Sequence, residues 1–298
     1  MKKAKKTGFL SIFILLAVAL GLFYATNPEK LPFFNPKTAN FTGGGFSVHF
    51  IDVGQGDSAL IRCGEVSVLI DAGDTDDDKT VCDYIKAQGV SSLDLIIATH
   101  PHADHIGGMD SVIKEFGAQR FIMPDIPDSM VPTTKTYEQM LNAIITKNIT
   151  AEPAEAGTSF KLGELHVEIL GPVGKHDNLN DYSVAARLSC GGVSILMEGD
   201  CEKAAEEAYI KNSGNIQSTI FKAGHHGSKT SNTQNLLDSV QPDYIVICCG
   251  KDNSYNHPSP EAMNRFEKLD KPIYQTQSHG NIVFSLNDGI LKITTDKE

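Results

Sequence analysis

A short stretch with three histidines and one aspartate is the part of the sequence best suited to chemistry. Residues 98–108 read ATHPHADHIGG, so His100, His102, Asp104 and His105 fall within six positions. Zinc prefers imidazole and carboxylate ligands at about 2.0–2.2 Å, and a catalytic site keeps one coordination position for water. Two histidines two residues apart in a turning loop converge on one ion, and the Asp-His pair suits a second. The stretch therefore predicts a site for two metal ions.

Two ions held about 3.5–4 Å apart need a shared anion. The predicted bridge is Asp200, which ends the strand-like segment VSILMEGD. A second motif, KAGHHGSKTS at 222–231, supplies His225 and His226. Adjacent histidines do not easily face the same ion. We expect His226 to be the ligand, because the small Gly227 behind it permits a tight approach, and His225 to contact the substrate or the attacking water.

Further side chains near these motifs suit contacts with ligand histidines or with an anionic substrate. Asp71 ends a strand that matches the one before Asp200, and we expect its carboxylate to orient a ligand histidine or the loop rather than to bind metal. The tight turn 52–58 is expected to line the cleft, and residues beside the two adjacent histidines to hold a phosphate. These candidates are Gln55 and Asp57 in the turn, and Lys222, Ser228 and Lys229 beside the histidines.

Strand-like and helix-like segments mix from residue 46 onward. The short apolar run 93–99 leads directly into the histidine stretch and is typical of a buried strand that delivers a motif from its carboxyl end. The other predicted strands are 46–53, 58–63, 66–73, 165–171, 183–190, 193–200, 218–224, 243–250, 272–276 and 281–286. The predicted helices are 77–89, 107–117, 134–147, 202–212, 232–240 and 259–268.

Two stretches of the chain resemble each other. Residues 58–74 and 183–200 each read as a strand, a Cys-Gly turn, a second strand beginning Val-Ser and an acidic ending. This echo favours a fold of two similar β halves, with the metal site between them. The chain has six cysteines but no Cys-x-x-Cys pair, so a thiolate zinc site is not indicated.

The first 25 residues differ from the rest. Four lysines precede an uncharged apolar stretch, 8–25, which is just long enough to span a bilayer. We favour an uncleaved membrane anchor over a signal peptide cut after about residue 25, because position −3 would then be the bulky Phe23. A linker rich in proline and glycine follows at 26–45. Without the four lysines, 22 basic residues stand against 37 acidic ones, a charge of −15 that argues against a broad nucleic-acid surface.

These motifs together resemble the metallo-β-lactamase superfamily, and within it the metallo-hydrolase domain of the DNA-uptake protein ComEC. The resemblance implies an α/β fold, a four-layer αβ/βα sandwich over 46–298, and a role for His257 in binding substrate or donating a proton. Many members place a third histidine for the first ion before the bridging aspartate, where this chain has Asn180 and Asp181; His176 lies upstream. The motifs that carry the resemblance are FIDVGQGDSALI, VLIDAG, THPHADHIGG, NDYSVAARL, MEGD, KAGHHGSKTS and NHPSP.

The resemblance implies a hydrolase with two zinc ions, or manganese in their place. Such ions lower the pKa of a water and stabilise a phosphoryl transition state, so a phosphodiesterase or nuclease is expected. Asp104 is placed to orient the attacking water, and His225 or His257 to protonate the leaving oxygen. One alternative is an enzyme for small phosphodiesters such as phosphorylcholine esters, which the negative charge favours. Another is a silent binding module. The partners expected are a phosphodiester and, through 8–25, a membrane; no protein partner is inferred.

Overall fold

Two β-sheets form the centre of the described chain, residues 45–297 of the computed structural model. One sheet has eight strands in the order β15-β14-β1-β2-β3-β4-β5-β6, and the other has seven in the order β13-β12-β11-β10-β9-β8-β7. The predicted apolar segment 1–25 and nearly all of the predicted linker lie outside the described residues.

The strands of the first sheet are β1 (Phe46–Phe50), β2 (Ala59–Cys63), β3 (Val66–Ile70), β4 (Leu93–Ile97), β5 (Ala118–Met123), β6 (Ala151–Pro153), β14 (Ile282–Asn287) and β15 (Ile290–Thr295). Those of the second are β7 (Ser159–Leu162), β8 (Leu165–Ile169), β9 (Ala186–Cys190), β10 (Val193–Met197), β11 (Ile220–Lys222), β12 (Tyr244–Ile247) and β13 (Ile273–Gln275). The helices are α2 (Asp78–Ala87), α3 (Ala103–Ile106), α4 (Met109–Phe116), α5 (Lys135–Thr146), α6 (Lys203–Asn212), α7 (Gln234–Val240), α8 (Pro260–Glu267) and α9 (Thr276–His279).

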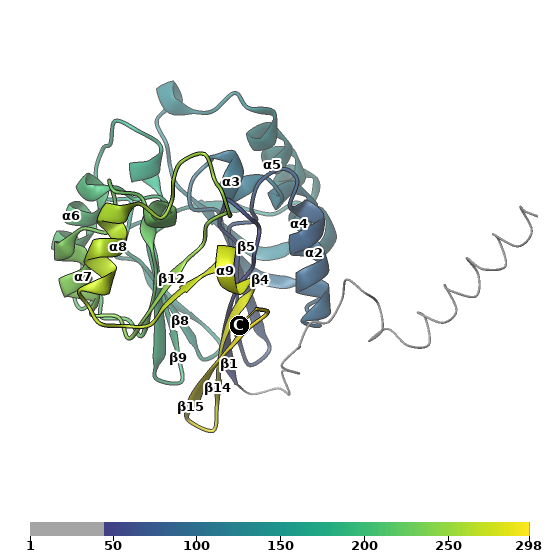
Figure 1. The fold of residues 1–298 in the computed structure, drawn as a ribbon. Coiled ribbons are helices and arrows are strands. Elements are labelled where there is room, and N and C mark those ends of the chain that lie inside the picture. Colours follow the sequence, from purple (N-terminus) through teal and green to yellow (C-terminus); the bar gives the residue numbers. More distant parts are fainter. Residues whose placement is uncertain (1–44, 298) are drawn as a thin grey trace, which may run out of the picture. The chain divides into compact units, whose positions relative to one another are not determined.

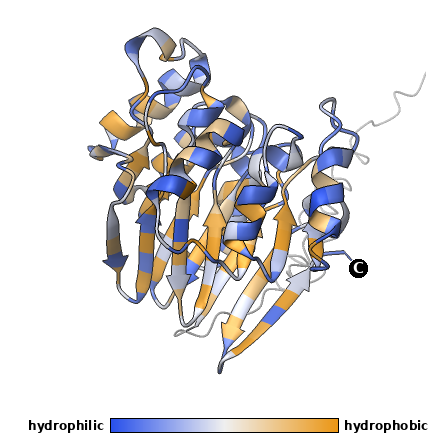
Figure 2. Ribbon diagram, turned by 90° about the vertical axis from the view of Figure 1, so that its left-hand side faces the viewer, coloured by the Kyte–Doolittle hydropathy of each residue, from blue (hydrophilic) through white to orange (hydrophobic). Residues whose placement is uncertain are grey.

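Helices cover the outer face of each sheet, which gives four layers (Figure 1). Helices α2, α4 and α5 pack on the eight-stranded sheet through one apolar cluster, and α6, α7 and α8 pack on the seven-stranded sheet through another. A third apolar cluster lies between the sheets. The strands are accordingly the most hydrophobic part of the ribbon (Figure 2). The prediction of an αβ/βα sandwich is confirmed.

The central strands are buried on both faces. In β2, Ala59 and Ile61 face the opposite sheet, whereas Leu60 faces the helices, because successive side chains of a strand point to opposite faces. A strand with two buried faces reads as a continuous apolar run. The sequence pattern does not reveal β5, β6, β7 or β15, because β6, β7 and β15 are sheet edges with no buried residue and β5 contains the polar pair Gln119 and Arg120.

The repeated sequence corresponds to two equivalent hairpins, β2–β3 and β9–β10, one in each sheet. Cys63 pairs with Val66 across the first hairpin, and Cys190 pairs with Val193 at the same position of the second. A disulfide joins Cys63 to Cys190, 127 residues apart in the chain. The bond therefore links the two halves of the sandwich, while the other four cysteines are buried and unpaired within residues 45–297.

The motifs predicted to do chemistry follow the carboxyl ends of neighbouring strands. Strands β3 and β4 run parallel, as do β10, β11 and β12. Their following loops therefore meet at one edge of the sandwich. Within residues 45–297, none of the helices has the length and apolar character needed to span a bilayer.

Candidate metal centre

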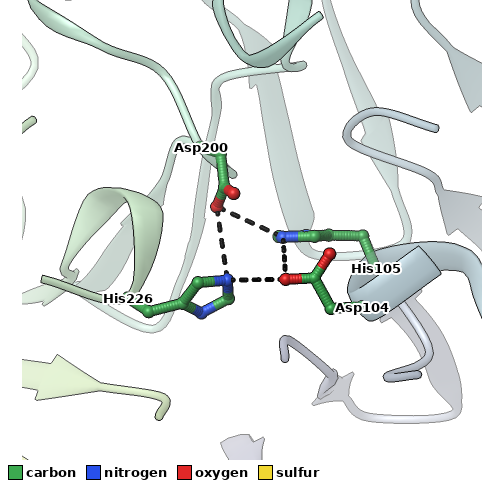
Figure 3. Close-up of side chains that lie close together, drawn as sticks. All are labelled: Asp104, His105, Asp200 and His226. Atoms are coloured by element: carbon green, nitrogen blue, oxygen red, sulfur yellow. Dashed lines mark hydrogen bonds and ion pairs between the residues drawn. The ribbon is translucent and has the colours of Figure 1, made fainter. Parts of the chain in front are cut away.

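Four side chains from three separate segments meet at this edge (Figure 3). Asp104 and His105 lie in α3, Asp200 follows β10 and His226 follows β11. His226 Nε2 lies 3.2 Å from Asp104 Oδ2 and 3.6 Å from Asp200 Oδ1. His105 Nε2 lies 3.2 Å from Asp200 Oδ1 and 3.9 Å from Asp104 Oδ2. Ligand atoms around a tetrahedral zinc ion are about 3.3–3.6 Å apart, so this four-residue group fits one ion.

A second, three-residue group consists of His100, His102 and Asp200. His100 Nε2 lies 3.0 Å from His102 Nδ1 and 3.7 Å from Asp200 Oδ2. His100 is buried, whereas His102 is partly exposed. Within residues 45–297 this group includes no third histidine. The upstream candidate, His176, instead packs its ring against that of Tyr182, with centroids 5.3 Å apart. An ion held here would keep positions open to water and substrate.

Asp200 belongs to both groups through different oxygens. Its Oδ1 faces His105 and His226, and its Oδ2 faces His100. The backbone N–H of Asp200 donates to Ser183 Oγ at 3.1 Å, which holds the turn after β10. The carboxylate is thus arranged as the bridge that two neighbouring cations require.

Hydrogen bonds on the far side of the rings orient the histidines. His105 Nδ1 lies 2.8 Å from Asp71 Oδ2, and the other oxygen of Asp71 accepts the N–H of Thr99 at 2.8 Å. His226 Nδ1 lies 3.0 Å from the carbonyl of Cys248. A proton on Nδ1 satisfies these acceptors and leaves the Nε2 lone pair toward the shared point.

The electrostatics of the four-residue group fit a cation. His105 Nε2 and Asp200 Oδ1 are buried and face each other without a well-formed hydrogen bond. Burial alone lowers the pKa of His226, but Asp200 and Asp57 raise it to about 9. Burial raises the pKa of Asp200, but His105 and His226 hold it well below its usual value. The carboxylates therefore retain protons on the histidines until a divalent ion replaces them.

Lys222 is not available to a substrate, and the expectation that it holds a phosphate is wrong. Its side chain is completely buried and its ammonium group pairs with Asp57. A buried ammonium ion requires such a partner, because desolvation otherwise costs too much. Burial raises the pKa of Asp57, but Lys222 and His226 lower it to about 2. Asp57 Oδ1 lies 3.3 Å from His226 Nδ1, so the pair sits behind the His226 ring.

The two adjacent histidines diverge because of an unusual backbone. His225 and His226 both have left-handed conformations, with φ of 48° and 52°, which few residues other than glycine adopt. His226 is buried in the four-residue group, whereas His225 is partly exposed and its Nε2 lies 3.6 Å from Asp200 Oδ2. The structure thus brings His226 to one group and turns His225 toward the other.

Asn232, which no sequence motif indicated, hydrogen-bonds to the backbone on both sides of this turn. Asn232 Oδ1 accepts the N–H of Gly224 at 2.8 Å, and its Nδ2 donates to the carbonyls of Gly224 at 2.9 Å and Ser228 at 3.5 Å. The buried carboxylate of Glu206 in turn accepts the N–H groups of Asn232 and Thr233. Helix α6 is thereby connected to the histidine turn.

The remaining predicted residues surround the centre. Gln55 Oε1 accepts the N–H of Gly250 at 3.1 Å and ties the turn 52–58 to the loop after β12. Asp181 Oδ1 accepts the N–H of Glu202 at 2.9 Å. Asn180 Oδ1 is buried and makes no hydrogen bond within residues 45–297.

Three further candidates differ in their access to solvent. Ser228 is buried and its hydroxyl pairs with that of Thr230 at 3.0 Å, whereas Lys229 is exposed. The His257 ring lies 5.4 Å from that of His225. Burial, followed by His225 and His226, lowers the pKa of His257 to about 4. His257 is therefore uncharged at neutral pH, which suits substrate contact better than proton donation.

Comparison with known proteins agrees with this geometry. The chain is 28% identical over 256 residues to ComE operon protein 3 of Bacillus subtilis, covering 80% of this chain and 32% of that protein. It is 29% identical over 245 residues to competence protein ComA of Neisseria gonorrhoeae, covering 81% and 32%. The chain thus spans about a third of the length of these relatives.

Solved structures show the same architecture at low identity. The metallo-beta-lactamase fold protein YhfI from Bacillus subtilis matches with a TM-score of 0.53 and 12% identity, covering 80% of this chain and 99% of that one. Residues 51–251 match the family model of the metallo-beta-lactamase superfamily. With the two candidate metal groups at the expected edge of the sandwich, the chain is a ComEC-like member of the metallo-beta-lactamase superfamily.

Proposed function

We propose that this chain is an exported, metal-dependent phosphodiesterase that cleaves DNA. The observation that carries the proposal is the sharing of Asp200 between the three-residue and four-residue groups. This is the arrangement expected of an enzyme that stabilises an in-line displacement at phosphorus with two cations. The names of the competence relatives support DNA as the substrate class.

The residues would divide the work as follows. His100, His102 and Asp200 would hold one ion, and Asp104, His105, Asp200 and His226 the other. Two zinc ions there, or manganese, would supply positive charge to the phosphoryl oxygens and lower the pKa of a water. Asp104 would orient that water, and the partly exposed His225 would contact a phosphate oxygen, with the exposed Lys229 beyond it.

Two observations support an extracytoplasmic location. The Cys63–Cys190 disulfide is typical of proteins that fold in an oxidising compartment. The competence relatives suggest a membrane or extracytoplasmic context. We propose that the apolar stretch 8–25 anchors the chain in the membrane and leaves the domain 46–298 outside.

A small phosphodiester, such as a phosphorylcholine ester of the cell envelope, is the second candidate substrate. The charge of −15 outside the first 25 residues favours it, because DNA phosphates are repelled by a net negative surface.

The test is metal analysis of the purified protein together with assays on linear DNA and on bis(p-nitrophenyl) phosphate. We expect about two bound ions per chain and hydrolysis that a chelator abolishes and zinc or manganese restores. Activity on a lactone or a β-lactam alone would contradict the proposal. Absence of all hydrolysis after metal is added would support a silent binding module.

A further inference from the structure

The loop between β12 and α8 (Figure 1) carries His257 and Tyr255. Their rings continue a series of ring contacts that begins at the two adjacent histidines of the metal centre. The ring of His257 lies 5.4 Å from that of His225 and 6.3 Å from that of His226. The Tyr255 ring in turn stacks on that of His257, with centroids 5.7 Å apart and planes at 23°. The series therefore starts at a buried candidate ligand and ends at Tyr255.

The ring of Tyr255 is largely exposed to solvent. Its side chain is 66% exposed, and every other Phe or Tyr side chain among residues 45–297 is buried or half-buried. A tyrosine that served the core would bury its ring. Here the ring contacts His257, and most of its remaining surface faces water.

The loop holds Tyr255 in place through one side chain. Asn253 Oδ1 accepts the N–H of Tyr255 at 3.2 Å and the N–H of His257 at 3.0 Å. Asn253 Nδ2 donates to the carbonyls of Gly250 at 2.9 Å and His257 at 2.6 Å. An exposed ring whose backbone is fixed loses little conformational freedom when a second flat ring stacks on it.

We propose that Tyr255 is a stacking platform for an unpaired nucleobase next to the phosphate held at the metal centre. The inference rests on the proposed phosphodiesterase function and makes its substrate class a nucleotide or a single nucleic-acid strand. Base–aromatic stacking is tolerant of sequence because every base presents a flat π-face. It would add affinity without a basic surface, which suits a domain of strongly negative charge.

A quaternary ammonium group is the other ligand that an aromatic ring attracts. Sites for such cations are built as cages of several aromatic rings. Within residues 45–297 the Tyr255 ring contacts one other ring, that of His257, and no further Phe or Tyr lies against it to form a cage. The single ring stacked on His257 favours a base.

The test compares three esters with the same p-nitrophenyl leaving group: the thymidine 5′-phosphate, methyl phosphate and phosphorylcholine esters. With the metal-loaded full chain, we expect Tyr255→Ala to raise KM for the thymidine ester about tenfold or more and to leave the methyl ester unchanged. Tyr255→Phe and Tyr255→Trp should retain the preference. Ile290→Ala, which removes another exposed large side chain, is the control.

A second measurement separates this inference from the proposed function. Binding of a labelled phosphorothioate oligothymidylate is compared with that of an abasic strand of equal length. Preference for the base-bearing strand, lost in Tyr255→Ala, supports the platform even if no ester is hydrolysed, in which case only the phosphodiesterase proposal fails. Equal binding of both strands, or a Tyr255→Ala loss confined to the phosphorylcholine ester, would overturn it.

Discussion

At the scale of single residues, the candidate site depends on which atom of each side chain is already engaged. His105 and His226 use Nδ1 toward Asp71 and the Cys248 carbonyl, so both present Nε2 to the same point. Asp200 divides its two oxygens between the two groups. The substitution of each of these side chains is therefore expected to affect metal binding in a different way.

Asp200→Asn should remove metal from both groups, because the amide keeps the size of the carboxylate but loses the charge that two cations share. We expect the metal content to fall from about two ions to less than one, with activity reduced at least about a hundredfold, beyond the 10–100-fold that outer partners cost. Metal analysis and hydrolysis of bis(p-nitrophenyl) phosphate measure this. Asp76→Asn, an exposed carboxylate, should leave both unchanged.

The pKa of His226, raised to about 9 in the metal-free protein, predicts a pH dependence. The protonated ring stabilises the folded state fully below its ordinary pKa of about 6.5, and this contribution is lost as the pH rises through 9. In chelator, the unfolding temperature should fall between pH 6.5 and 9, with a loss on the order of 3 kcal/mol. The decline should be smaller in His226→Gln, where His105 remains, whose pKa burial lowers but Asp200 and Asp71 raise well above its usual value. Metal binding should tighten over the same range, since a proton must leave.

At the scale of elements, a turn with two left-handed histidines is held by neighbours that belong to neither metal group. The backbone of His225 and His226 is unfavourable for these residues, and Asn232 hydrogen-bonds to the chain on both sides of it. Glu206 of α6 holds Asn232 in turn. The position of a candidate ligand thus depends on a helix that lies outside the site.

Asn232→Ala should weaken metal binding by the four-residue group about 10–100-fold. The turn that presents His226 would lose the side-chain hydrogen bonds to Gly224 and Ser228 that hold it. Calorimetric titration of the metal-free protein with zinc measures the affinity. Asn235→Ala removes an exposed asparagine from the same α7 region and is the matched control. An unchanged affinity in Asn232→Ala would show that the turn is held by other contacts.

At the scale of the whole described domain, two similar hairpins are joined across the sandwich. The Cys63–Cys190 disulfide connects equivalent positions of the two sheets. The candidate metal centre also uses both halves, since His100 to His105 come from one and Asp200 and His226 from the other. Both features depend on the sheets remaining packed face to face.

Reduction of this disulfide should lower the free energy of unfolding by about 2–4 kcal/mol, because the cross-link restricts the unfolded chain. Urea unfolding with and without dithiothreitol measures the difference. A Cys63→Ser, Cys190→Ser double variant should match the reduced protein and show no response to reductant. If the reductant also destabilises the double variant, the effect does not come from this bond.

Much of the fold and part of the site follow from the sequence. Runs of apolar residues buried on two faces reveal the central strands, and the spacing of His100, His102, Asp104 and His105 reveals a place for metal. The edge strands stay hidden because they bury too little to leave a pattern. The burial of Lys222 beside Asp57 was not foreseeable either, since they lie 165 residues apart.

The sequence by itself determined the types of ligand, the family resemblance and the pairing of the two β halves, because these depend on local spacing and periodicity. Only the tertiary structure decided which oxygen of Asp200 meets which group, that His225 turns toward Asp200 Oδ2, and that the Tyr255 ring stacks on His257. The physical reason is that these relations are set by backbone conformation and by packing between distant segments, neither of which a local pattern of residues records.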